Sequence, residues 1–371
     1  MLNFLISITS RASLGRSKTL ITSLLDEGSN VHVALTASST ISKFGDVRPE
    51  FNLMKKEYKN LTLVEFNTLV ESSSKSSLEK TLALGILSLS DYVSNEKIDS
   101  IITVADRFET LASSIVASYK GIFLAHLQGG ERSGNIDDKV RNANTTLADI
   151  HFPTTDKARA RLLGMTNSRM IFNFGCPSID LARQSLQLEP TLPTGTGKNF
   201  ELNQPFIIVM QHPEYPCEYS AIEQIEGTLN AVTKFDLPIL WFWPNADFGT
   251  EDTVSQIRKR REKGELRNIF FIKNTDPLNF LAILRNAKVL IGNSSAGIRE
   301  ASFFGIRAVN IGTRQSNRER ANNVIDADYD SESIYFAIRN ALDAGSVLPS
   351  SIFGDGYSGN KIARQLIRAL K

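Results

Sequence analysis

Short apolar runs rich in β-branched residues alternate with amphipathic stretches over almost the whole chain. This alternation is typical of βαβ units and predicts parallel sheets covered by helices, an α/β fold. Helical periodicity is clearest over Leu78–Val93, where we expect a helix. We expect strands at Phe4–Ile8, Val31–Leu35, Leu61–Phe66, Ser100–Val104, Gly121–Ala125, Ile150–Phe152, Ile171–Phe174, Phe206–Met210, Ile239–Trp243, Ile269–Ile272, Val289–Ile291 and Ala308–Ile311.

The composition changes near the middle of the chain. Residues 183–204 are enriched in Gln, Pro, Gly and Thr, which is typical of a linker. The length of 371 residues allows about two domains, each with its own core. We therefore expect a Rossmann-like domain over 1–182, a linker over 183–204, a second Rossmann-like domain over 205–356, and a C-terminal segment over 357–371 with an amphipathic helix at Lys361–Leu370.

Charge and cysteine content exclude several classes of protein. The net charge of +2 provides no basic surface for duplex nucleic acid. No apolar stretch reaches the ~18 residues that a membrane span needs. The two cysteines, Cys176 and Cys217, have neither a disulfide-framework nor a zinc spacing, which favours a reducing cytoplasm. No G-x-G-x-x-G follows the first strand and no metal-ligand spacing occurs, so we expect no cofactor and no metal.

Polar residues directly follow the apolar run Gly121–Ala125. The segment His126–Arg141 contains a histidine, carboxylates, arginines and glycines. Ligands of open α/β sheets bind at the carboxyl ends of the strands, so we expect these side chains at a ligand site. Carboxylates can act as general acid and base, arginines can hold phosphate, and glycines let the backbone approach an anion. The pattern predicts a catalytic loop.

A second informative segment is Val289–Glu300, in which a strand leads into a turn rich in Gly, Asn and Ser and then into a helix. Backbone N–H groups and the helix dipole at such a turn can bind diphosphate, with Ser294 and Ser295 as further donors. Glu300, near the second helical turn, can accept hydrogen bonds from a ribose diol. The alternative is that Asn293 or Ser294 only caps the helix.

Both segments resemble the hydrolysing UDP-N-acetylglucosamine 2-epimerases of sialic acid and related sugar pathways. His126-Leu-Gln-Gly-Gly-Glu131 and Ile-Asp137-Asp-Lys-Val-Arg141 are similar to the family's His-Ile-x-Gly-Gly-Glu and Ile-Asp-Asp/Glu-x-x-Arg, and Gly-Asn-Ser-Ser-x-Gly-x-x-Glu300 also matches. The resemblance covers nearly the whole chain. It implies two Rossmann-like domains facing each other across a cleft, the glycosyltransferase-B-like architecture, with the last helix crossing back to the first domain, and a homodimer.

Other motifs of the family follow further strands. Asp106 lies in Asp-Arg-Phe-Glu and His212 in Gln-His-Pro, and both are similar to family motifs. Asn245 and Asp247 lie in Pro-Asn-x-Asp, where an Asx turn is the alternative interpretation. Arg314 lies in Asn-x-Gly-x-Arg-Gln-x-x-Arg-Glu, where the alternative is a solvated basic surface.

Roles follow from this resemblance. The acid–base and charge-stabilising carboxylates would be Asp106, Glu131 and Asp137, with His212 as a proton donor or diphosphate partner. Substrate would be bound by Arg11, His126, Gln128, Arg141, Asn245, Asp247, Asn293, Ser294, Ser295, Glu300 and Arg314.

The sequence departs from the family at a few positions. Gln128 stands where many relatives have Glu. An amide cannot exchange protons near neutral pH, so Glu131 and Asp137 must carry more of the acid–base chemistry. Ala105 replaces a glycine, and Arg11 lacks the Asp-Tyr pair that often accompanies it in relatives.

These features predict a hydrolysing 2-epimerase that acts on a UDP-linked N-acetylhexosamine, either UDP-GlcNAc or a 2,4-diacetamido-6-deoxy analogue. In the family, UDP is eliminated across C1–C2 and water then adds to the unsaturated sugar on its other face, which releases UDP and the C2-inverted sugar. Two alternatives remain: a UDP-sugar-dependent glycosyltransferase, and a UDP-sugar-binding paralogue with weak catalysis. We expect a cytoplasmic enzyme of sialic acid or other cell-surface polysaccharide biosynthesis, with no membrane insertion.

Overall fold

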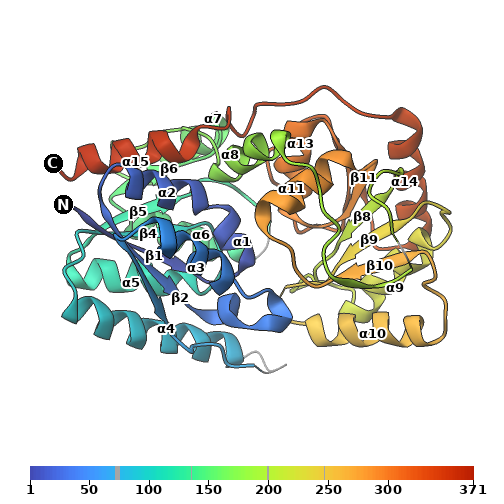
Figure 1. The fold of residues 1–371 in the computed structure, drawn as a ribbon, viewed down its shortest axis with the longest axis horizontal. Helices are drawn as coiled ribbons and strands as arrows, with labels where there is room; N and C mark the ends of the chain where they lie inside the picture. Colours follow the sequence, from blue (N-terminus) through green and yellow to red (C-terminus); the bar gives the residue numbers. More distant parts are fainter. Residues whose placement is uncertain (72–75, 135, 199, 246) are drawn as a thin grey trace. The chain divides into compact units, whose positions relative to one another are not determined.

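Strands and helices alternate along the chain in a computed structural model that describes residues 1–71, 76–134, 136–198, 200–245 and 247–371 (Figure 1). The chain divides into two units, each built around its own sheet. The first unit contains Met1–Arg132, Ile136–Leu181 and Phe353–Lys371, and the second consists mainly of Ala182–Ile352.

The first unit has a parallel sheet of buried apolar strands. Within the described residues the strand order is β3-β2-β1-β4-β5-β6, and each pairing is parallel. The strands are β1 (Asn3–Ile8), β2 (Asn30–Leu35), β3 (Leu61–Glu65), β4 (Ser100–Val104), β5 (Phe123–Leu127) and β6 (Ile150–Phe152). The helices are α1 (Arg11–Gly15), α2 (Lys18–Asp26), α3 (Arg48–Glu57), α4 (Ser76–Asn95), α5 (Thr110–Lys120), α6 (Asp137–Leu147), α7 (Asp156–Leu163), α8 (Pro177–Gln184), which ends in the second unit, and α15 (Ser358–Ala369).

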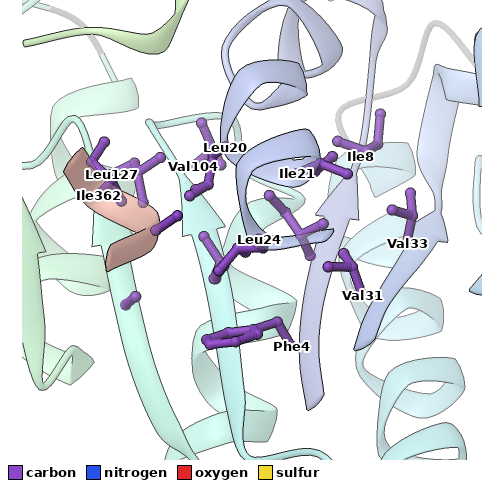
Figure 2. Close-up of a cluster of buried hydrophobic side chains, with 14 of the residues drawn as sticks. Phe4, Ile8, Leu20, Ile21, Leu24, Val31, Val33, Val104, Leu127 and Ile362 are labelled. Atoms are coloured by element: carbon purple, nitrogen blue, oxygen red, sulfur yellow. The ribbon is translucent and has the colours of Figure 1, made fainter. Parts of the chain in front are cut away.

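Helices α2 and α15 lie side by side on this sheet (Figure 1). Figure 2 shows Leu20, Ile21 and Leu24 of α2 and Ile362 of α15 turned toward apolar side chains of the sheet such as Val104. The last helix of the chain therefore completes the core of the first unit.

A glycine and a carboxylate fix the start of α15. A Cβ on Gly359 would lie 2.6 Å from the backbone carbon of Thr19, so only glycine allows this approach to α2. Asp180 accepts the N–H groups of Ser358 at 2.8 Å and Gly359 at 2.6 Å, and the Thr19 hydroxyl at 3.0 Å. The carboxylate thus satisfies donors at the helix start that have no intrahelical partner.

The second unit repeats the α/β pattern with the strand order β13-β12-β11-β8-β9-β10-β7 among its described residues. All pairings are parallel except that of β7 with β10. The strands are β7 (Gly195–Gly197), β8 (Ile207–Met210), β9 (Ile239–Phe242), β10 (Ile269–Ile272), β11 (Val289–Gly292), β12 (Arg307–Ile311) and β13 (Val324–Ala327). The helices are α9 (Ala221–Val232), α10 (Thr250–Glu262), α11 (Pro277–Asn286), α12 (Ser295–Ile298), α13 (Glu300–Phe304) and α14 (Ser331–Ala344).

The predicted α/β class with two parallel sheets is confirmed, but individual strands differ. Ile171–Phe174 is not a strand: Ile171 makes only an isolated bridge with His151. The Phe172 and Phe174 rings instead pack on Phe152, with centroids 6.3 and 6.2 Å away. None of the helices in the described part of the chain has the length and apolarity that a membrane crossing needs.

Three further strands differ from the prediction: one starts later than expected, and two were not predicted. The strand expected at Gly121–Ala125 starts later, because Gly121 ends α5 in a left-handed conformation with φ 66°. The structure also has β7, within the expected linker, and β13. Neither has the long apolar run on which the strand predictions were based, since β7 reads Gly-Thr-Gly and β13 includes the exposed Asp326.

Candidate active site

Arg11, Asp106 and Gln128 follow three neighbouring strands of the first unit. Strands β1, β4 and β5 are adjacent and parallel, so their carboxyl ends lie at one edge of the sheet. Arg11 begins α1 shortly after β1, Asp106 follows β4, and Gln128 comes directly after β5. The structure thus brings these three predicted residues to one edge.

The backbone at this edge is strained. Ala105 has φ 65° and Gln128 has φ 64°, in the left-handed region that non-glycine residues rarely adopt. The Ala105 N–H donates to the Leu127 carbonyl, and the Gln128 N–H donates to the Phe152 carbonyl, both at 2.9 Å. The strained conformations are therefore held by bonds to neighbouring strands, as is common at functional sites.

Arg141 of α6 joins the acidic residues of this edge. Its guanidinium donates to the Asp106 and Asp138 carboxylates and, at 2.9 Å, to the Glu131 carbonyl. The Arg141 and Asp106 side chains are 1% and 7% exposed, so the ion pair is buried. Burial alone would lower the pKa of Arg141, but the charges of Asp106, Glu131 and Asp138 outweigh it and raise that pKa.

Two other predicted carboxylates lie beside this ion pair. Glu131 is buried and accepts the Thr154 hydroxyl at 2.6 Å. Asp137 is the first residue of α6 and is partly exposed. Because Asp137 and Arg141 are four residues apart on one helix, they share a helix face. In the part of the chain that the structure describes, no three His, Cys, Asp or Glu side chains are grouped as metal ligands would be.

His126 lies within β5, not in the loop after the strand where we expected it. Its ring is fully buried, with Nε2 3.1 Å from the Ala105 carbonyl and Nδ1 3.2 Å from the Thr145 hydroxyl. Burial lowers its pKa to about 3, which makes the ring neutral at physiological pH. Both ring nitrogens of His126 thus contact protein groups, one of them the Ala105 carbonyl, and the predicted contact with substrate stays a prediction.

Protonation of the buried histidines should make the protein acid-sensitive. His151 pairs in register with His126, is fully buried, and has no hydrogen-bond partner for either ring nitrogen within the described residues. Burial lowers the pKa of His151 to about 4 from its ordinary 6.5. Below pH 6.5 the unfolded chain therefore takes up protons that the folded chain refuses, so stability falls as the pH drops toward 4.

We expect His151→Phe to flatten this pH dependence, removing about 2 kcal/mol of the stability lost between pH 7 and pH 5. Urea unfolding at the two pH values measures the difference. The same loss in the variant and the natural protein would contradict the prediction.

Gln128 has a half-satisfied amide. Its Nε2 donates to the Cys176 sulfur at 3.2 Å, whereas its buried Oε1 has no partner among the described residues. The Cys176 sulfur also lies 3.0 Å from the Ser178 hydroxyl. The free carbonyl oxygen can accept a hydrogen bond from an N–H or O–H group of a ligand.

The second unit gathers polar residues at the carboxyl ends of β8, β9, β11 and β12. Asn293, which follows β11, donates to the His212 carbonyl and accepts the His212 N–H, each at 2.8 Å. Asn293 is fully buried, and the Gln315 side chain donates to its carbonyl at 3.0 Å. The Asn293 side chain therefore holds the backbone of His212, and its predicted contact with substrate stays a prediction.

The position of the His212 proton follows from one hydrogen bond. The Asn245 N–H donates to Nδ1 of His212 at 3.2 Å, so Nδ1 is an acceptor and the neutral ring carries its proton on Nε2. Asp247 Oδ2 lies 3.9 Å from Nδ1 and 3.7 Å from the Arg314 guanidinium. The structure thus brings the predicted residues His212, Asn245, Asp247 and Arg314 together. The His212 Nε2–H and the Arg314 guanidinium can both donate to phosphate oxygens.

The Ser-rich turn differs from the single helix that we expected. Ser294 caps α12 by accepting the Ala296 N–H at 3.3 Å, as in the alternative interpretation of this segment. The helix breaks at Arg299, and Glu300 begins a new helix, α13. Glu300 is buried, and its Oε2 has no partner among the described residues. Ser295, the first residue of α12, remains partly exposed.

Two residues that the sequence analysis did not single out, Thr154 and Glu214, form hydrogen bonds with predicted site residues. Thr154 binds the Glu131 carboxylate, and Glu214 binds the backbone of Thr313 and Arg314. Glu214 could have been found from its position, because it follows His212 at the same strand end. Thr154 follows β6, the strand beside β5.

Several known proteins that are similar to this chain are named as 2-epimerases. A family model described as UDP-N-acetylglucosamine 2-epimerase matches residues 26–367. The UDP-N,N'-diacetylbacillosamine 2-epimerase (hydrolyzing) of Legionella pneumophila is 31% identical over 297 residues, which cover 80% of this chain and 77% of that protein. The UDP-N-acetylglucosamine 2-epimerase of Neisseria meningitidis is 27% identical over 93% of this chain and 89% of its own length.

The fold agrees with the same family. The crystal structure of Methanocaldococcus jannaschii UDP-GlcNAc 2-epimerase in complex with UDP-GlcNAc and UDP matches with a TM-score of 0.80 at 18% identity, over 99% of this chain and all of that one (100%). Solved epimerases of this kind have the glycosyltransferase-B-like fold that the sequence predicted. The family match and the 31% identical relative together show that this chain belongs to the UDP-N-acetylglucosamine 2-epimerase family.

Proposed function

We propose that this protein is a hydrolysing 2-epimerase that converts a UDP-linked N-acetylhexosamine into UDP and the C2-inverted free sugar. The observation that carries the proposal is the acidic group Asp106, Glu131 and Asp137 around Arg141, in a chain whose 31% identical relative is named as a hydrolysing enzyme. We propose UDP-GlcNAc or a 2,4-diacetamido-6-deoxy analogue as substrate, since relatives with both kinds of name match this chain.

The first step would be an elimination. A carboxylate of the acidic group removes the C2 proton, the C1–oxygen bond breaks, and its electron pair leaves with UDP, which creates a C1=C2 double bond in the sugar. Asp106, which pairs with Arg141, can stabilise the positive charge that develops at C1. In the second step water adds its oxygen to C1, and C2 takes a proton on the opposite face. Glu131 and Asp137 are the proposed acid and base.

The polar residues of the second unit are the proposed UDP site. The Nε2–H of His212 and the Arg314 guanidinium would donate to the departing diphosphate, whose negative charge needs cations or N–H groups. Glu300 Oε2, which has no partner in the part of the chain that the structure describes, would accept a ribose hydroxyl, and Ser294 and Ser295 would donate to phosphate. We also propose Arg11 as a phosphate ligand.

The oligomeric state, the cellular location and the pathway of the protein are also proposals. We propose a homodimer that works in the cytoplasm and supplies sugar for a cell-surface polysaccharide of the sialic acid type. A 26% identical relative named Polysialic acid biosynthesis protein P7, from Escherichia coli, supports this setting.

Turnover in deuterated water tests the reaction. We expect free UDP to appear at the same rate as the C2-inverted sugar, with deuterium at C2, because the carbon must be reprotonated from solvent. NMR and chromatography of the products of UDP-GlcNAc and UDP-diacetylbacillosamine measure both. A product that is still attached to UDP, or one without C2 deuterium, would refute the hydrolytic mechanism.

Gln128 favours a second candidate, a UDP-sugar-binding paralogue with little catalysis, because its amide cannot exchange protons near neutral pH. The same incubation separates the candidates. Binding of UDP without release from UDP-sugars would indicate the paralogue, and release that requires an acceptor would indicate a glycosyltransferase.

A further inference from the structure

Glu214 is the centre of a buried hydrogen-bond network in the second unit. Its side chain accepts the backbone N–H groups of Thr313 at 3.1 Å and Arg314 at 3.0 Å, and the Tyr329 hydroxyl at 2.6 Å. It also accepts the Thr313 hydroxyl. Because all four partners donate, a carboxylate with two accepting oxygens satisfies them, and an amide, which has only one accepting oxygen, cannot do so equally well.

The position of Glu214 is itself fixed. The Gln224 side chain of α9 accepts the Glu214 N–H at 2.9 Å and donates to its carbonyl at 3.0 Å. The Tyr329 ring lies against Gly312, where a Cβ would come within 2.3 Å of the ring. Burial and then the charge of Glu214 raise the pKa of Tyr329, so its hydroxyl stays protonated and remains a donor.

This network connects two strand ends that the sheet does not connect. Glu214 follows β8, and Thr313 and Arg314 follow β12, but β11 lies between these strands. No ladder hydrogen bond can therefore set the spacing of the two loops directly. Glu214 bridges the gap, and its own loop carries His212.

We propose that Glu214 is a positioning residue, which holds Arg314 at a fixed separation from His212 so that both can bind one diphosphate. The inference rests on the proposed function, since it assigns a diphosphate to these residues. Arg314 Nη2 lies 3.7 Å from Asp247 Oδ2, which lies 3.9 Å from His212 Nδ1, so the Arg314 guanidinium and the His212 ring lie on either side of one carboxylate. Four hydrogen-bond donors stabilise the buried Glu214 carboxylate, which explains how it can lie next to a predicted anion site.

Glu214→Gln tests the proposal with two measurements. Hydrogen exchange of the Thr313 and Arg314 amides, followed without ligand, should become faster because both lose an ionised acceptor. The Kd for UDP, measured by calorimetry, should rise by roughly tenfold or more, the effect of losing one charged hydrogen bond. Since Glu214 is bonded to Thr313, Arg314 and Tyr329 and not to a proposed acid or base, KM should rise more than kcat falls.

A double-mutant cycle with Arg314→Ala separates positioning from general destabilisation. If Glu214 acts through Arg314, Glu214→Gln should weaken UDP binding little further once Arg314 is absent. Thr313→Val removes only one donor to the carboxylate, so it should show a smaller change in the same direction even if Glu214→Gln does not fold.

Two control variants complete the design. Glu226→Gln removes a carboxylate of α9 that pairs with Arg260, and it should change neither UDP affinity nor exchange at Thr313 and Arg314. Glu300→Ala should weaken UDP binding but leave that exchange unchanged. Unchanged exchange and UDP affinity in both Glu214→Gln and Thr313→Val, or additive losses in the cycle, would overturn the inference alone. Failure of the natural protein to bind UDP would overturn it together with the proposed function.

Discussion

Replacing Arg141 with methionine is expected to lower the free energy of unfolding by about 3–5 kcal/mol, the cost of leaving a buried charge without its partner. Arg141 and Asp106 are 1% and 7% exposed and form a direct ion pair between α6 and the end of β4. Methionine fills a similar volume but donates no hydrogen bond. Urea unfolding, monitored by circular dichroism, measures the loss.

The double variant Asp106→Leu with Arg141→Met provides the control. Removing both charges leaves neither one buried alone, so the double variant should lose less than the sum of the two single variants. Arg339→Met, at a surface pair whose side chains are 60% and 72% exposed, should show no measurable loss. Strict additivity at Asp106 and Arg141 would show that the pair is not coupled.

This ion pair also limits how Asp106 can be tested. Asp106→Asn leaves Arg141 with a weakened partner, so a loss of activity would combine a catalytic effect with an effect on folding. Asp137 allows a cleaner test, because it is partly exposed.

The fold was largely predictable because buried parallel strands are apolar on both faces and stand out from the amphipathic helices between them. The exceptions have different physical causes. Ile171–Phe174 has the composition of a strand, but its phenylalanines pack on Phe152 and its backbone makes only a bridge. Strand β7 pairs with β10 through a Gly-Thr-Gly backbone with no apolar side chain to reveal it.

The candidate site residues were predicted from the family resemblance and from one rule, that ligands bind at the carboxyl ends of parallel strands. The rule gives the location of a residue but not the direction of its side chain. His126 bonds to Thr145, and Asn293 bonds to His212, 81 residues away in sequence. Partners so distant in sequence cannot be read from a local motif, so the sequence did not distinguish groups that hold the backbone from groups that are free to meet a ligand.

The partners of Glu214 could not be read from the sequence for the same reason. Its partners Thr313, Arg314 and Tyr329 lie 99 to 115 residues further along the chain. The break between α12 and α13 was missed for another reason: Arg299 carries no Pro or Gly signal for a helix end, and its irregular backbone, with φ −97° and ψ −71°, is visible only in the structure.

Glu131→Gln and Asp137→Asn are each expected to lower kcat on the order of a hundredfold, or about 2.7 kcal/mol in activation free energy, because an amide cannot transfer the proton at C2. Both variants should fold and bind UDP. The amide oxygen introduced by Glu131→Gln can still accept the Thr154 hydroxyl, and asparagine is tolerated in the first turn of a helix. Initial rates of UDP release at saturating substrate measure kcat, and calorimetry with UDP checks binding.

Asp149→Asn is the matched control for these two variants. Asp149 is an exposed carboxylate of the same unit that accepts the Leu124 N–H at 2.8 Å, just before β6. It therefore lies near the amino ends of β5 and β6, at the opposite edge of the sheet from Glu131, and its amide variant should keep the kcat of the natural protein. If Glu131→Gln and Asp137→Asn both matched Asp149→Asn, proton transfer would have to come from other groups. Because Gln128 cannot supply it, the proton acceptor would then have to be sought at Asp106 or His212.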